Sequence, residues 1–168
     1  MTISMYTASV PRFSNTLKSL SEILTKAQAH AEARKIDPAV LLGARLYPDM
    51  FAFTRQVQIA CDGPKGCVAR LAGIEVPKHE DFETTFPELQ QRIAKVVSFI
   101  ESVPAEKIDG SEERRIVIPV RNEELVFTGL QYLTGFVIPN FYFHVTTAYG
   151  ILRHNGVELG KRDFLGKI

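Results

Sequence analysis

The stretch YTASVPRFSNTLKSLSEILTKA, residues 6–27, carries the pattern that decides the fold. Its apolar side chains recur in alternating steps of four and three, at Tyr6, Val10, Phe13, Leu17, Leu20, Leu24 and Ala27. Such steps place every member on one stripe of a helix, which predicts a long helix that buries one face in a helical bundle. Ser9 is one candidate N-cap, whereas the stripe running from Tyr6 favours an earlier start that tolerates Pro11 in the first turns.

Three further segments have helical signals. Asp37 followed by Pro38 predicts a short helix over residues 39–44. Apolar spacing from Met50 predicts a second long helix that ends at Gly73, with a kink or local break at Gly63-Pro64. Thr85 and Glu88 form a capping-box pattern that opens a third long helix, whose stripe is Phe86, Leu89, Ile93, Val96, Ile100 and Val103.

The C-terminal third changes character. Residues 115–120 and 124–127 are two short β-prone runs that predict a small hairpin covering one end of the bundle. The fourth helical region spans residues 128–155 and is apolar nearly all round between Leu133 and Val145. Such a helix is buried on most faces or presents one face to a second subunit. Residues 156–168 are assigned no regular structure.

Composition limits the class of protein. The 168 residues suit one domain over 1–168, and a net charge of +1 disfavours nucleic acid as a partner. A secretory signal and a membrane-spanning stretch are both missing, which predicts a cytoplasmic protein with no membrane partner. Cys61 and Cys67, six apart in a helical segment, lie roughly 9 Å apart at the helical rise, too far to bridge. They are interpreted as reduced, inert thiols.

Several long strings resemble a family of unknown function within the DinB/YfiT-like superfamily. They are PNFYFHVTTAY (139–149), ILRHNG (151–156), YPDMF (47–51), RQVQIA (55–60), ARLAG (69–73) and LGKRD (159–163). The resemblance implies an all-α four-helix bundle with up-down-down-up connectivity, with a small hairpin before the last helix, and commonly a homodimer. It also implies a divalent metal held by three histidines, one on the second helix and two spaced four apart on the last. In thiol-dependent relatives that metal activates a thiol.

The sequence departs from this three-histidine pattern. His144 matches the second histidine of the last helix, and Asn140 stands where the first should be. The second helix has no histidine: the motif resemblance favours Gln58 near the lost position, whereas the apolar phase places Gln56 closer to the interior. One imidazole with two neutral amides is a weak set for zinc or nickel, so a metal would need Asp49 as an additional donor.

Each candidate also has a structural interpretation. Asp49 after Pro48 suits a helix N-terminus, and Asn140 and His144 are spaced to hydrogen-bond each other. His144 has the strongest claim to function, because an imidazole amid apolar neighbours needs a partner and burial would lower its pKa, which suits a neutral base. Tyr142 and Tyr149 are candidate ligand contacts, with core packing as the alternative. The remaining histidines are interpreted as helix-end (His154) or surface (His30, His79) residues.

Two hypotheses of function remain open, and whether the chain is an enzyme is undecided. The first is a small-molecule-binding or metal-binding bundle with a degenerate three-histidine site centred on His144, which would act as a base or ligand. The second is a noncatalytic dimeric bundle with an interaction or stress-associated role. A pocket of several hundred cubic ångströms with converging polar groups would favour the first, and a filled interior would favour the second.

Overall fold

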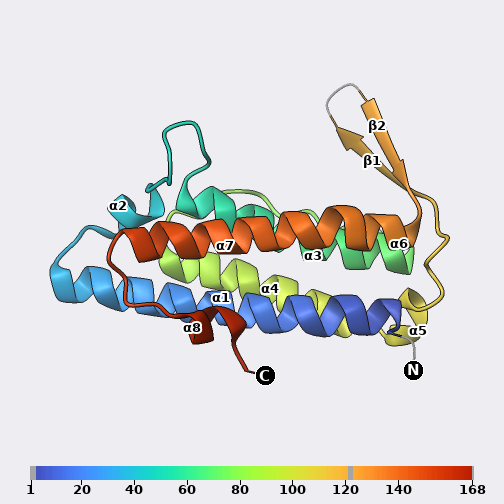
Figure 1. Cartoon of the computed structure of the whole chain (residues 1–168), viewed down its shortest axis with the longest axis horizontal. Helices are drawn as coiled ribbons and strands as arrows, with labels where there is room; N and C mark the ends of the chain where they lie inside the picture. The colour runs from blue at the N-terminus through green and yellow to red at the C-terminus, as the bar shows by residue number, and fades with distance from the viewer. Residues whose placement is uncertain (1–2, 121–122, 168) are drawn as a thin grey trace.

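Four helices of 17 to 30 residues form the body of the molecule in the computed structural model, which describes residues 3–120 and 123–167 (Figure 1). They are α1 (Met5–Arg34), α3 (Phe53–Ala72), α4 (Phe86–Ser102) and α7 (Ile138–His154). In Figure 1, α1 and α7 run one way along the bundle, and α3 and α4 run the other way. This is the predicted up-down-down-up order. None of the described helices is long and apolar enough to cross a membrane.

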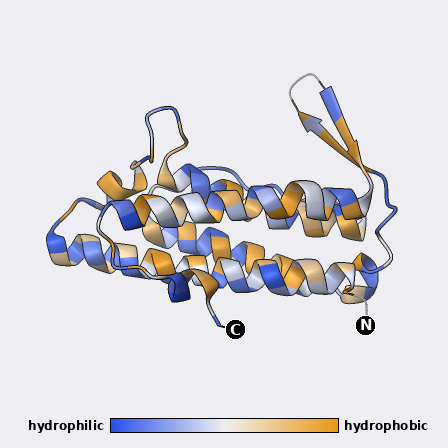
Figure 2. Ribbon diagram, in the orientation of Figure 1, coloured by the Kyte–Doolittle hydropathy of each residue, from blue (hydrophilic) through white to orange (hydrophobic). Residues whose placement is uncertain are grey.

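The apolar stripes meet in a single interior. α3 packs against α7 and α4, and α4 packs against α1. The ring of Phe13 on α1 meets Phe141 on α7 edge-on, with ring centroids 5.1 Å apart, and Phe53 on α3 lies 6.2 Å from Phe86 on α4. Figure 2 shows the corresponding alternation of hydrophobic and hydrophilic residues along each long helix. The apolar stripes predicted for the first three long helices are therefore core faces.

Local signals explain where helices begin. The side chain of Ser4 accepts a hydrogen bond from the Thr7 N–H, so α1 begins before the alternative cap at Ser9 and contains Pro11. Asp37 caps the short α2 (Pro38–Leu42). The capping box of α4 is confirmed, because Thr85 and Glu88 each accept from the other's backbone N–H. α3 is continuous through Gly63-Pro64, so the proline does not break it.

The fourth helical region is divided. It begins with α6 (Gly129–Gln131), widens into a π-helix, η1 (Tyr132–Val137), and continues as α7. Pro139 has no N–H to donate, and its ring crowds the carbonyl four residues earlier. A wider turn before it accommodates that crowding, which periodicity alone does not reveal.

The hairpin pairs β1 (Ile116–Val120) with β2 (Glu123–Phe127) in antiparallel register, with Ile116 opposite Phe127. Its predicted turn at residues 121–122 lies outside the described residues. The expectation that it covers one end of the bundle is wrong, because it projects away from the helices near α6, on the other edge of the bundle from the short helix α5 (Ala105–Ile108) (Figure 1). Its inner part contributes apolar contacts: Ile116 is buried, Ile118 packs against the core, and Phe127 lies 6.0 Å from Tyr132 between ring centroids.

The assignment of no regular structure after residue 156 is also wrong. α8 (Lys161–Leu165) forms one short turn of helix that packs on α1. Asp163 accepts from the Gly160 N–H at 2.8 Å and pairs with Lys26 of α1 at 2.7 Å. Tertiary contact holds this turn, which is too short to have a detectable period.

Candidate functional site

His144 points inward from α7 and meets Gln56 of α3. The imidazole is only 7% exposed, and its Nδ1 lies 2.7 Å from the Oε1 of Gln56. The amide of Gln56 also donates through Nε2 to the Phe51 carbonyl oxygen at 3.1 Å. Of the two glutamines left open by the sequence, Gln56 is thus the one that contacts the histidine.

These two hydrogen bonds fix the protonation of the ring. Only the NH₂ group of Gln56 can donate to the Phe51 carbonyl, so its Oε1 faces His144 and can only accept. Nδ1 of His144 therefore carries the proton, and Nε2 carries the lone pair. Among the described residues, Nε2 has no hydrogen-bond partner.

The charge state follows from the surroundings. Burial lowers the pKa of His144, and the nearby Arg55 guanidinium lowers it further. The imidazole is therefore neutral at pH 7, with Nε2 available as an acceptor or base.

The other sequence candidates lie elsewhere. Gln58 is buried on another face of α3, where its Nε2 donates to Glu83 at 2.9 Å. Asn140 is half-buried one turn before His144, but the histidine's partner is Gln56, so the expected bond between Asn140 and His144 is replaced. Asp49 is exposed in the turn before α3, four residues ahead of the helix start at Phe53. It therefore does not cap the helix.

Tyr142 and Tyr149 contact different parts of the molecule. Tyr142 is half-buried and joins Phe143, Thr147 and Leu46 in the lining of a groove of about 550 Å³ on the outer side of α7. The ring of Phe143 meets the His144 imidazole edge-on at 5.1 Å, so the groove adjoins the histidine. Tyr149 packs edge-on against Phe164 of α8 at 6.0 Å and belongs to a separate contact.

Both cysteines are free and buried, as expected. Burial raises the pKa of the Cys61 thiol to about 12 and raises that of Cys67 as well. Neither is a thiolate at neutral pH, so neither is a nucleophile.

A buried ionic cluster joins α3, α4 and the connection between them, and sequence reasoning missed it. Arg92 of α4 is 3% exposed and pairs with Glu83 at 3.0 Å, Asp62 at 3.0 Å and Asp81 at 2.9 Å. Burial acts to raise the pKa of Glu83, but hydrogen bonds from Arg92 and Gln58 outweigh it and lower that pKa. One signal was present in the sequence: Arg92 sits three residues after Leu89 and four before Val96, on the apolar stripe.

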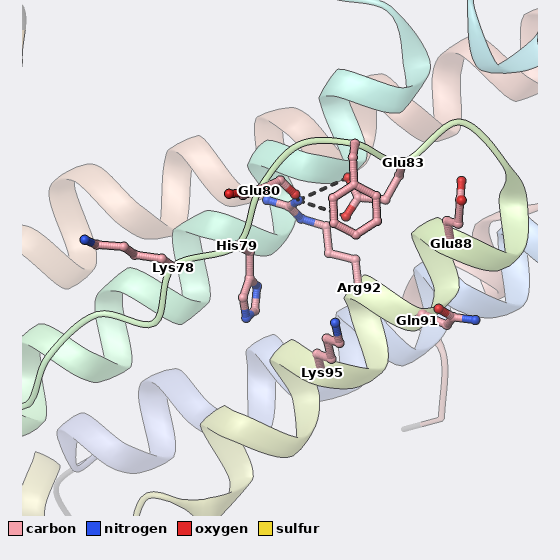
Figure 3. A pocket seen from close by; sticks show the side chains of 9 residues that line it. Lys78, His79, Glu80, Glu83, Glu88, Gln91, Arg92 and Lys95 are labelled. Carbon is pink, nitrogen blue, oxygen red and sulfur yellow. Dashed lines mark hydrogen bonds and ion pairs between the residues drawn. The ribbon is translucent and has the colours of Figure 1, made fainter.

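The same cluster forms one wall of a pocket of about 180 Å³ (Figure 3). His79, on the connection between α3 and α4, lines this pocket with Lys95 and Arg92. Its Nδ1 is buried and has no hydrogen-bond partner among the described residues. The expectation that His79 is a plain surface residue is therefore wrong, because the connection folds back over α4.

Comparison with known proteins identifies the family. Residues 5–165 match the profile described as "Domain of unknown function (DUF1993)". This chain belongs to the DUF1993 family. A DinB family member protein from Shewanella denitrificans, known from its crystal structure, is 48% identical to it, with a TM-score of 0.87 over 97% of this chain and 92% of that one. A search of the curated proteins finds no match.

Membership in this family raises the question of a metal. In this DUF1993 chain the first donor position holds Asn140, the second-helix position holds an amide already bonded to His144, and Asp49 is exposed. Among residues 3–120 and 123–167, no group of three or more His, Cys, Asp or Glu side chains could hold an ion. The residues present do not fit a three-histidine centre.

Proposed function

We propose that this DUF1993 chain is a small-molecule-binding bundle in which neutral His144 acts through Nε2 as hydrogen-bond acceptor or base. The observation that carries the proposal is the 2.7 Å bond between Nδ1 of His144 and Oε1 of Gln56. That bond holds the ring in one tautomer and one orientation, as a second partner does for catalytic and ligating histidines.

The proposed ligand enters by the groove outside α7. Phe143 and Thr147, on either side of His144 in sequence, line that groove with Leu46 and Gly150. Such a lining favours a largely apolar molecule that presents an O–H or N–H to the imidazole. Asn140, one turn before His144, and Tyr142 are the proposed further contacts, and Gln56 is a positioning residue.

The tautomer is testable by ¹⁵N NMR titration of the imidazoles. We expect a pKa for His144 below 6.5 and a neutral form protonated at Nδ1. Gln56→Glu should raise that pKa, because a carboxylate beside Nδ1 favours the charged ring. Gln56→Met should remove the preference for the Nδ1–H tautomer. An unchanged tautomer in Gln56→Met would contradict the positioning role.

Binding is testable by ligand-observed NMR with a library of small aromatic alcohols and amides. Compounds that bind the wild type should lose binding in His144→Gln and keep it in His154→Gln, a control at an exposed position of the same helix. Compounds that bind all three proteins equally would exclude His144 as the recognising group.

A second candidate function is a noncatalytic homodimeric bundle, placed like the first in the cytoplasm, where its two thiols would stay reduced. Exposed apolar side chains favour it: Phe143 is 55% exposed, and Leu46, Tyr47 and Phe51, before α3, are exposed as well. A second copy that covered this face would close the groove.

A further inference from the structure

The pocket beneath the connection between α3 and α4 is separate from His144. Because α3 and α4 point the same way, residues 73–85 must run back along the bundle from the end of α3 to the start of α4. This connection covers part of α4. Figure 3 shows His79 and Lys95 directed into the same opening, one from the connection and one from α4, with Arg92 above them. The space of about 180 Å³ compares with an engineered cavity of about 150 Å³ that holds benzene.

The hydrogen-bonding groups around this space are unbalanced. Both carboxylate oxygens of Glu83 accept from Arg92, and one also accepts from Gln58. Glu88 is engaged by Thr84 and Thr85 at the start of α4. Both oxygens of Glu83 and the Oε2 of Glu88 are thus in use.

The donors are not all in use. Arg92 is nine-tenths buried or more, yet its Nε–H has no partner among the described residues, and neither has the buried Nδ1 of His79. Within the same part of the chain, Lys95 forms no ion pair with any acidic residue. The lining holds as many carboxylates as cations, but its unpartnered N–H groups suit a ligand that brings acceptor oxygens.

We propose that this pocket binds a small organic acid through its carboxylate or phosphate group. Lys95 and His79 contact the oxyanion, and the unpartnered Nε–H of Arg92 is a further donor to it. Phe82 also lines the pocket and is 63% exposed, so it offers an apolar surface to the rest of the acid. The proposal is independent of the function proposed for His144.

Protonation links to binding at this site. Burial lowers the pKa of His79, and the cations Lys65 of α3 and Arg92 and Lys95 of α4 lower it further, while Asp62 of α3 opposes them. A bound anion favours the charged ring and raises this pKa. By linkage, the anion must bind more tightly as the pH falls through the titration range of His79.

The test is an NMR titration of the full chain with sodium phosphate and, separately, sodium benzoate, against sodium chloride at matched ionic strength. We expect saturable shifts of the His79 imidazole with at least one of the two acids and a rise in its pKa on saturation. Lys95→Gln should weaken binding about fivefold. Glu80→Gln should strengthen it about twofold, because it removes a negative charge from the lining.

Each outcome is decisive. Tighter binding of phosphate assigns a phosphorylated ligand, and tighter binding of benzoate assigns a carboxylic acid. Shifts that match those of chloride, or that are unchanged in Lys95→Gln and Glu80→Gln, would overturn the proposal. Both substituted residues are exposed, so the variants are expected to fold.

Discussion

Single polar residues in the interior carry both candidate sites of this protein. Arg92 and His144 each occupy a position on the buried face of a long helix, and each has a side-chain partner from another segment. Burying either group without its partner would be strongly unfavourable, and the partners determine what each group can do. Arg92 needs counter-charges and is consequently fixed as a cation. His144 is kept neutral by its burial and by the nearby Arg55 charge, and the Gln56 amide holds its Nδ1.

The Arg92–Glu83 pair predicts a marked asymmetry between single and double variants. Arg92→Met should lower the free energy of unfolding by about 3 kcal/mol or more, because it leaves the Glu83 carboxylate buried and unpaired. Replacing both residues by Met should cost less than Arg92→Met alone. Urea unfolding of the wild type, both single variants and the double variant measures this. Strictly additive losses would show that the two charges are not coupled.

At the scale of elements, the segment before α7 fixes where that helix starts. Gly129, the first residue of α6, packs so closely on the loop after α5 that a Cβ there would lie 2.0 Å from the Ser111 carbonyl oxygen. The Leu130 N–H donates to the Glu112 carbonyl oxygen at 2.9 Å in the same contact. This contact anchors the start of the continuous helical run of α6, η1 and α7, which carries His144 further along.

A matched pair of glycine substitutions tests this anchor. Gly129→Ala should destabilise the fold by about 1–3 kcal/mol, because the backbone oxygen of Ser111 cannot rotate away as a side chain would. Gly63→Ala, in the middle of α3 with no atom within 4 Å of its Cβ, should instead stabilise by about 0.5–1 kcal/mol. Thermal and urea unfolding of both variants provide the comparison. A stabilised Gly129→Ala would contradict the close approach.

At the scale of the whole molecule, the order of the helices produces two surface features: the proposed acid-binding pocket and the exposed apolar segment before α3. Two successive helices that run the same way need a connection as long as the bundle, and residues 73–85 supply the roof of the acid-binding pocket proposed above. The segment between α2 and α3 presents Leu46, Tyr47 and Phe51 to solvent, and Leu46 lines the groove on α7 together with Phe143.

The proposed homodimer predicts a defined effect of one surface substitution. Light scattering coupled to size-exclusion chromatography should give twice the chain mass for the wild type at micromolar concentration. Phe143→Ser should shift the mass toward that of one chain, because it removes a large apolar group from the contact. Val126→Ser, at a similarly exposed position of the hairpin (52%), should not. A wild type with the mass of one chain at all concentrations would exclude the dimer.

The parts of the fold that were predicted correctly from the sequence depend mostly on local patterns. Helical stripes such as Tyr6 to Ala27 and the capping box of Thr85 and Glu88 depend on neighbours within one or two turns, so they are readable without coordinates. α8, the π-helix before Pro139 and the projecting hairpin were missed or misplaced, because contacts or crowding between distant segments decide them. At the site, the resemblance singled out His144, while the apolar phase favoured the correct glutamine.

The amino-acid sequence by itself thus determined the long helices and their buried faces, since periodicity reports which side of a helix is buried, while the family resemblance added the helix order and His144. Only the tertiary structure decided that Gln56 holds the ring, that Gln58 serves the Arg92 cluster instead, and that His79 closes a pocket. Those outcomes depend on which side chains from separate helices come within hydrogen-bonding distance, and no spacing along one chain segment encodes that.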